Sequence, residues 1–155
     1  DGVEDGIPEP DPVLEISVDG YIPDDYIADP RYKLELYRRF AGLDYGEKDD
    51  LLDEIIDRFG EPPEEVEVLW RVACLRALCR LLHIRGISVK PGELRITFAE
   101  NAAIDPTALM QLISEQQQYM NFKSGAQAQL IFRTVKLKTD SLTWLEKNLP
   151  RLAFD

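Results

Sequence analysis

The chain has 155 residues, of which 45% are hydrophobic and 30% are charged, and its formal net charge is −11. That length suits one domain with a substantial core, and the composition excludes a disordered chain. No apolar run approaches the roughly 18 residues of a membrane span, and no signal peptide opens the chain. Because it begins at Asp1 and not at Met, we expect a fragment of a longer cytoplasmic protein.

The charge is divided unevenly along the chain. Residues 1–70 carry 22 acidic and 6 basic side chains, a net charge of −16, whereas residues 71–155 carry 7 and 12, a net charge of +5. An acidic half repels phosphate backbones, and the other half lacks the dense basic clusters of nucleic-acid-binding proteins. We therefore expect no direct nucleic-acid binding, although a weak nucleic-acid-binding domain that uses the basic half stays open as an alternative.

The first 29 residues predict little regular structure. Residues 1–12 are acidic and rich in proline and glycine, and we expect them to form a flexible lead-in. Apolar residues alternate with polar ones from Leu14 to Val18, which predicts a half-buried strand within an extended connector over 13–29. The sequence does not say whether this strand pairs within the domain that we expect over 30–155.

Three helices are predicted next. Asp29 and Pro30 are typical of a helix start, and this helix ends before Gly42. Its expected inward face consists of Leu34, Tyr37 and Ala41, widened by Leu36 and Phe40. A second helix begins at Asp49 or Asp50 and ends before Gly60, with Leu52, Ile55, Ile56 and Phe59 inward. The longest helix runs from about Pro63 to His83, with an inward face of Val66, Leu69, Trp70, Ala73, Ala77, Leu78 and Leu81.

After the long helix, apolar residues recur at every second position, which is typical of strands. Residues 87–98 predict one hairpin and residues 119–135 a second, with a helix after Asp105-Pro106 between them and a last helix over 140–150. The fold class is therefore α+β: a small antiparallel β-sheet built from two hairpins, with about five helices packed on it.

The sequence offers no catalytic constellation, no cofactor site and no metal site. It contains neither a phosphate-binding glycine loop nor a nucleophile elbow. We expect the only histidine, His83, to cap the long helix, and Cys74 and Cys79 to be reduced core residues. Carboxylate runs at 49–54 and 61–67 suit helix starts better than a metal site. A metal-dependent accessory domain nevertheless stays open as an alternative.

One cluster of charged residues suits a partner surface. Glu54, Asp57 and Arg58 lie opposite the apolar face of the second helix, at a spacing that brings them together. We call these three residues the charge cluster. From the residues alone, a solvated helix face is favoured over a docking surface as the explanation of the cluster.

Four ordered segments resemble the C-terminal domain of bacterial transcription-repair coupling factors. They are Ile22–Asp29 followed by Arg31, Leu34, Tyr37, Arg38 and Arg39; Glu54–Gly60 with Pro63; Leu75, Arg76, Leu82, Ile84 and Arg85; and Ile96 with Phe98–Asn101. The resemblance covers about Leu14 to Leu149. One departure is His83, where the family pattern has glycine, and from it we expect the helix end to shift to Gly86 in this chain.

The resemblance implies a regulatory interaction domain and no enzyme. The parent of such a domain is an ATP-dependent DNA translocase that couples transcription to nucleotide-excision repair. The domain docks within the parent on a UvrB-like module, competes with UvrA for that module and restrains the motor. Matching positions make Glu54, Asp57 and Arg58 the expected docking residues. We expect no membrane partner and a monomeric fragment.

Overall fold

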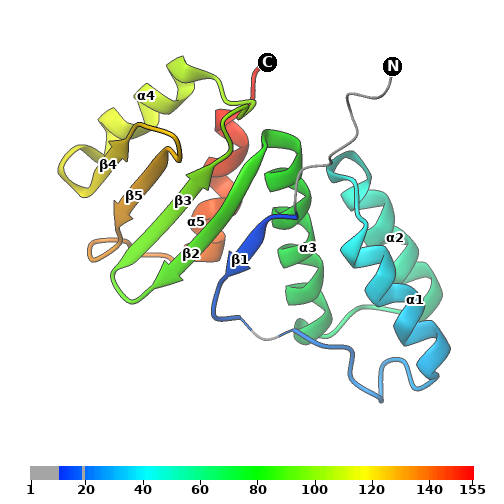
Figure 1. The fold of residues 1–155 in the computed structure, drawn as a ribbon. Helices are drawn as coiled ribbons and strands as arrows, with labels where there is room; N and C mark the ends of the chain where they lie inside the picture. Colours follow the sequence, from blue (N-terminus) through cyan, green and yellow to red (C-terminus); the bar gives the residue numbers. More distant parts are fainter. Residues whose placement is uncertain (1–10, 19) are drawn as a thin grey trace, which may run out of the picture. The chain divides into compact units, whose positions relative to one another are not determined.

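The computed structural model of the chain describes residues 11–18 and 20–155 and divides it into two compact units (Figure 1). One unit consists of the described residues up to Ile16 together with Cys79–Asp155, and the other consists of Ser17–Leu78. Most of the predicted flexible lead-in lies outside the described residues. No helix in the described part of the chain is long and apolar enough to cross a membrane.

A five-stranded sheet organises the first unit. Its strands are β1 (Val13–Glu15), β2 (Ile84–Lys90), β3 (Glu93–Phe98), β4 (Met120–Lys123) and β5 (Gln129–Arg133), in the order β1-β2-β3-β5-β4. The α+β class and the two predicted hairpins are confirmed. The sheet is mixed and not wholly antiparallel, because β1 pairs in parallel with β2. Parallel neighbours need a long crossover, and here the whole second unit lies between the two strands in the sequence.

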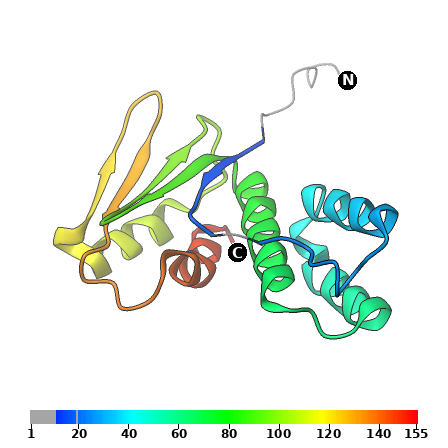
Figure 2. The same ribbon diagram turned by 90° about the horizontal axis from the view of Figure 1, so that it is seen from below.

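Two helices cover one face of this sheet, α4 (Pro106–Gln116) and α5 (Ser141–Asn148), and α5 continues into a short 3₁₀ helix, η4 (Leu149–Leu152) (Figure 2). Each helix starts with an aspartate whose side chain accepts a hydrogen bond from a backbone N–H in the first turn: Asp105 from Thr107 and Asp140 from Thr143. The buried core of this unit includes Ile87, Leu94, Ile96, Leu112, Leu130, Leu145 and Leu149.

The second unit is helical. It contains α1 (Pro30–Ala41), a 3₁₀ turn η2 (Tyr45–Glu47), α2 (Lys48–Phe59) and α3 (Glu64–Leu82) as far as Leu78. Asp29 caps α1 by accepting from the backbone N–H of Arg31, as predicted. Gly60 ends α2 with a φ of 90°, a conformation that glycine adopts at little cost. The core of this unit is formed by Ile22, Ile27, Leu36, Phe40, Leu43, Leu51, Ile55, Val66, Ala73, Cys74 and Ala77.

The predicted inward face of α1 is confirmed at Leu36 and Phe40 and wrong at Leu34, Tyr37 and Ala41. Leu36 and Phe40 are buried, whereas Leu34 is 51% and Tyr37 38% exposed, and Ala41 is also exposed. The α1 sequence has apolar residues on two stripes, and only contacts distant in sequence decide which stripe is buried. The Tyr37 hydroxyl instead accepts a hydrogen bond of 3.0 Å from the backbone N–H of Ile22.

The predicted faces of α2 and α3 also need correction at single positions. In α2, Leu51 and Ile55 are buried, and Leu52, Ile56 and Phe59 are half-buried. In α3, Leu81 is 57% exposed. The buried residues around it are Leu78, Cys79 and Leu82, so the buried face of the last turn does not include Leu81.

The end of α3 explains the departure at His83. The helix ends at Leu82, and His83 has a φ of 57°, in the left-handed region that favours glycine. Its Nδ1 lies 3.0 Å from the carbonyl oxygen of Asn101, so the ring does not cap the helix as predicted. The helix end does not shift to Gly86 either. Gly86 lies within β2, where a Cβ would meet the carbonyl oxygen of Val13 at 2.7 Å.

Candidate functional site

The charge cluster lies in the second half of α2. The acidic first turn of this helix, with Asp49 and Asp50, suits the positive end of the helix dipole. Further along, burial of Leu51 and Ile55 fixes the rotation of the helix. That rotation leaves Asp57 and Arg58 exposed and Glu54 half-buried.

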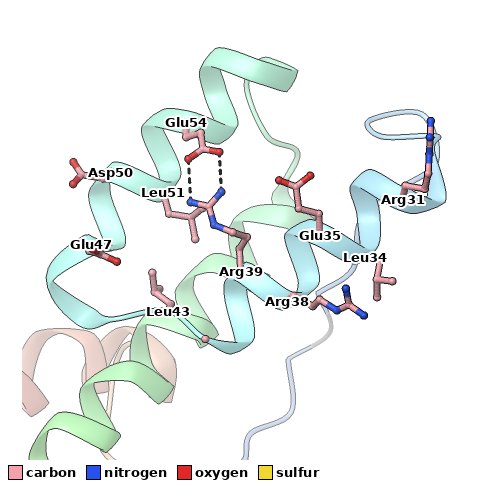
Figure 3. Close-up of a pocket in the computed structure, with 11 residues that line it drawn as sticks. Arg31, Leu34, Glu35, Arg38, Arg39, Leu43, Glu47, Asp50, Leu51 and Glu54 are labelled. Carbon is pink, nitrogen blue, oxygen red and sulfur yellow. Dashed lines mark hydrogen bonds and ion pairs between the residues drawn. The ribbon is translucent and has the colours of Figure 1, made fainter.

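The Glu54 side chain contacts α1. Arg39 donates two hydrogen bonds to the Glu54 carboxylate, from Nη1 to Oε2 at 2.8 Å and from Nη2 to Oε1 at 3.0 Å (Figure 3). A paired fork of this kind is the most directional ion pair that side chains make. Glu54 therefore joins α1 to α2 and is not a free carboxylate.

Arg58 is also bound from both helices. Its Nη1 lies 3.2 Å from Oε2 of Glu35 and 3.4 Å from Oε2 of Glu54. Its guanidinium lies 5.7 Å from the ring centroid of Tyr32 and 4.9 Å from that of Phe59, which are cation–π distances. The head of Arg58 is thus held in place, although its side chain stays 38% exposed.

Asp57 differs from its two neighbours in the cluster. It is exposed, and it has no hydrogen bond or ion pair with any residue in 11–18 or 20–155. Its charge is available to a partner, whereas the charge of Glu54 is already compensated. The structure thus brings the three predicted residues together but gives them different surroundings.

These contacts keep the network charged. The hydrogen bonds from Arg39 are the largest cause that lowers the pKa of Glu54 below its ordinary value. The hydrogen bond to Glu54 raises the pKa of Arg39, and the hydrogen bond to Glu35 raises the pKa of Arg58. An opposite charge at hydrogen-bond distance favours the ionised form of each group.

A pocket of about 770 Å³ opens between α1 and α2 beside this network (Figure 3). Its lining mixes both charges with leucines: Arg31, Leu34, Glu35, Arg38, Arg39, Gly42, Leu43, Glu47, Asp50, Leu51 and Glu54. Glu54 is the only cluster residue in this lining. The α1 residues Glu35 and Arg39 were not predicted as site residues, although they lie at i, i+4 and Arg39 belongs to a segment that carries the family resemblance.

The site is a network of ion pairs. Across residues 11–18 and 20–155, no group of three or more His, Cys, Asp or Glu side chains could hold a metal ion. The carboxylates of Glu54 and Glu35 accept hydrogen bonds from Arg39 and Arg58. What the site presents is a fixed arginine beside an unpaired aspartate.

Comparison with known proteins identifies the family. A family model described as the TRCF domain matches residues 16–109, which is more than half of the chain. This chain belongs to the TRCF domain family. The chain is 37% identical over 102 residues to the transcription-repair-coupling factor of Bacillus subtilis (strain 168), and the match covers 64% of the chain and 9% of that relative.

Two further comparisons extend over more of the chain. The transcription-repair-coupling factor of Escherichia coli (strain K12) is 28% identical over 140 residues, covering 90% of the chain and 12% of that relative. A crystal structure of the C-terminal domain of a transcription-repair coupling factor superposes with a TM-score of 0.72 at 24% identity, covering 92% of this chain and 94% of that chain. The chain thus spans a small part of the curated relatives, and the solved structure supports the fold.

Proposed function

We propose that this chain is a non-catalytic regulatory domain of a cytoplasmic transcription-repair coupling translocase. The domain docks through the charge cluster on the UvrB-like module of the same protein. In the docked state it masks the UvrA-binding surface of that module and restrains the motor. The observation that carries this proposal is the exposed pair formed by Asp57 and Arg58 on a helix of a TRCF domain.

The surroundings of Arg58 support a docking role. A long arginine side chain loses rotamer freedom when a partner binds it, at a cost of about 0.5–1.5 kcal/mol. Here Glu35, Glu54 and the ring of Phe59 already hold the guanidinium. Arg58 therefore loses less freedom on binding than a free arginine would.

The surroundings of Asp57 support the same role in a different way. An unpaired, exposed carboxylate binds a basic partner surface without first breaking an internal ion pair. Beside Arg58 it forms a pair of opposite charges, which favours one orientation of the partner over others. Charge complementarity of this kind gives an interface specificity and a faster association rate.

A regulatory contact must also be released. A ligand such as UvrA shifts an equilibrium between two states only by its difference in affinity for them. An interface built on a few exposed charges is weak enough for UvrA to displace, whereas a large apolar interface is not. The polar character of the cluster fits a reversible restraint.

The test uses the full-length parent protein with Asp57→Ala and Arg58→Ala combined. We expect tighter UvrA binding and faster ATP hydrolysis, because the docked state loses its contacts. The matched control combines Arg85→Ala with Glu100→Ala, which removes one exposed arginine and one exposed acid from the sheet unit. If UvrA affinity and the rate of ATP hydrolysis are the same in the cluster variant as in the control, the cluster does not dock.

A further inference from the structure

A second pocket lies in the sheet unit, where α4 passes into β4 and where β5 leaves the sheet. It is lined by residues of the turn after α4 and of the segment after β5, which Figure 1 colours yellow and orange. Its volume is about 450 Å³. The lining consists of Glu115, Gln116, Gln117, Gln118, Tyr119, Phe132, Arg133, Lys136, Leu137 and Lys138. We call it the basic pocket.

The basic pocket is positively charged within an acidic chain. Residues 116–139 contain four basic residues and no acidic residue, while the whole chain has a net charge of −11. The side chains of Lys136 and Lys138 are exposed and form no hydrogen bond or ion pair within the described ranges 11–18 and 20–155. Their charges are therefore available to an anion.

The one acid in the lining is already neutralised. Arg151 donates to Oε1 of Glu115 from Nη1 at 2.9 Å and to Oε2 from Nη2 at 2.6 Å. This pair compensates the carboxylate that would otherwise repel an anion. The net charge inside the pocket is set by Arg133, Lys136 and Lys138.

Arg133 is fixed in the wall of the pocket. Its Nη2 donates a hydrogen bond to the backbone carbonyl of Gln118, and its guanidinium lies 5.7 Å from the ring centroid of Tyr119. These contacts use only part of the guanidinium, which has five N–H donors. Arg133 thus offers a positioned cation beside two exposed lysines.

An unpaired strand edge adjoins the pocket. β4 is the outermost strand of the sheet and, among the strands of the described part of the chain, pairs only with β5 (Figure 1). It follows directly on Tyr119, and three of its four residues, Asn121, Phe122 and Lys123, are exposed. Backbone groups on the outer side of such an edge can pair with an added strand.

We propose that the basic pocket and the β4 edge bind an extended, acidic polypeptide segment of a partner. The backbone of that segment adds to β4, and its carboxylates contact Arg133, Lys136 and Lys138. A nucleic acid fits these observations less well, because its affinity comes from many phosphate contacts. Three cations and two aromatic residues, of which Phe132 is buried, supply few such contacts in a chain of net charge −11. This surface belongs to the sheet unit and is separate from the charge cluster on α2.

The test measures fluorescence anisotropy of a labelled peptide of alternating glutamate and valine residues, titrated with the 155-residue chain at physiological salt. Three further probes are titrated in parallel: the same peptide with glutamine for glutamate, the same peptide N-methylated along one edge of its backbone, and a duplex DNA. We expect saturable binding of the acidic peptide and at least about tenfold weaker binding of the other three.

A charge reversal then locates the site. Lys136→Glu with Lys138→Glu should weaken binding of the acidic peptide at least about tenfold. The control, Lys90→Glu with Lys147→Glu, reverses two exposed lysines outside the pocket and should weaken binding less than about threefold. Circular dichroism confirms that both variants fold. Equal loss in the two variants, no saturable binding of the peptide, tighter binding of the DNA, or undiminished binding of the N-methylated peptide would overturn the proposal.

Discussion

Arg39 on α1 and Glu54 on α2 form a two-point ion pair, with hydrogen bonds of 2.8 and 3.0 Å. The pair joins two helices whose buried faces meet in the same core. Because Glu54 also lies 3.4 Å from Arg58, the pair helps to hold the arginine that we assign to docking. Glu54 thus contributes to the charge cluster mainly by positioning Arg58.

The Arg39–Glu54 pair predicts a specific dependence of stability on pH. The pKa of Glu54 is lower in the folded chain than its ordinary value of 4.5. The contribution of Glu54 to the free energy of unfolding is therefore fully present above that value and is lost as the pH falls through the lowered pKa. Urea unfolding should show wild type more stable than Glu54→Gln near neutral pH, by less than about 1 kcal/mol because the pair is exposed.

The same comparison across pH and salt decides whether the ion pair is the cause. The difference between wild type and Glu54→Gln should shrink as the pH falls below 4.5. It should also shrink at about 1 M salt, where charges are screened within about 3 Å. A difference that stays constant with pH and with salt would assign the effect to packing and not to charge.

The left-handed backbone conformation of His83 predicts that glycine gives a more stable chain than alanine at this position. A side chain at a φ of 57° costs roughly 1–2 kcal/mol, which glycine avoids. Both His83→Gly and His83→Ala lose the hydrogen bond to the Asn101 carbonyl, so their comparison isolates the backbone conformation. His83→Gly should be about 1 kcal/mol more stable than His83→Ala by thermal or urea unfolding. Equal stability would mean that His83 is not left-handed in solution.

The close contact of Gly86 with β1 predicts that a methyl group added at this position lowers the stability of the fold. A Cβ at Gly86 would meet the carbonyl oxygen of Val13 at 2.7 Å, so Gly86→Ala should displace β1 from β2. The expected cost is about 1–3 kcal/mol, as for other overpacked sites, with faster hydrogen exchange across Val13–Glu15. Gly46→Ala is the matched control, because a Cβ there meets no atom within 4 Å. The pairing of β1 with β2 is incorrect if both variants exchange and unfold alike.

Local signals predicted the element boundaries well. Asp29 and Asp105, each followed by proline, start α1 and α4 as the sequence indicates, and Gly42 and Gly60 end α1 and α2. Such caps act within one turn of the chain, so neighbouring residues are enough to reveal them.

Contacts between distant residues could not be predicted in the same way. Leu34 and Tyr37 fit an apolar stripe as well as Leu36 and Phe40 do, and only the assembled core selects the second pair. The charge cluster was found because its three residues share one helix. Its partners Glu35 and Arg39, and the basic pocket, depend on segments that the fold brings together.

The most direct test of the docking claim is a calorimetric titration of the 155-residue chain against the separate UvrB-like module of the parent protein. We predict saturable binding that Asp57→Ala with Arg58→Ala weakens at least about tenfold, with Arg85→Ala and Glu100→Ala binding like the wild type. Absence of binding, or equal affinity of the cluster variant and the wild type, would contradict the account.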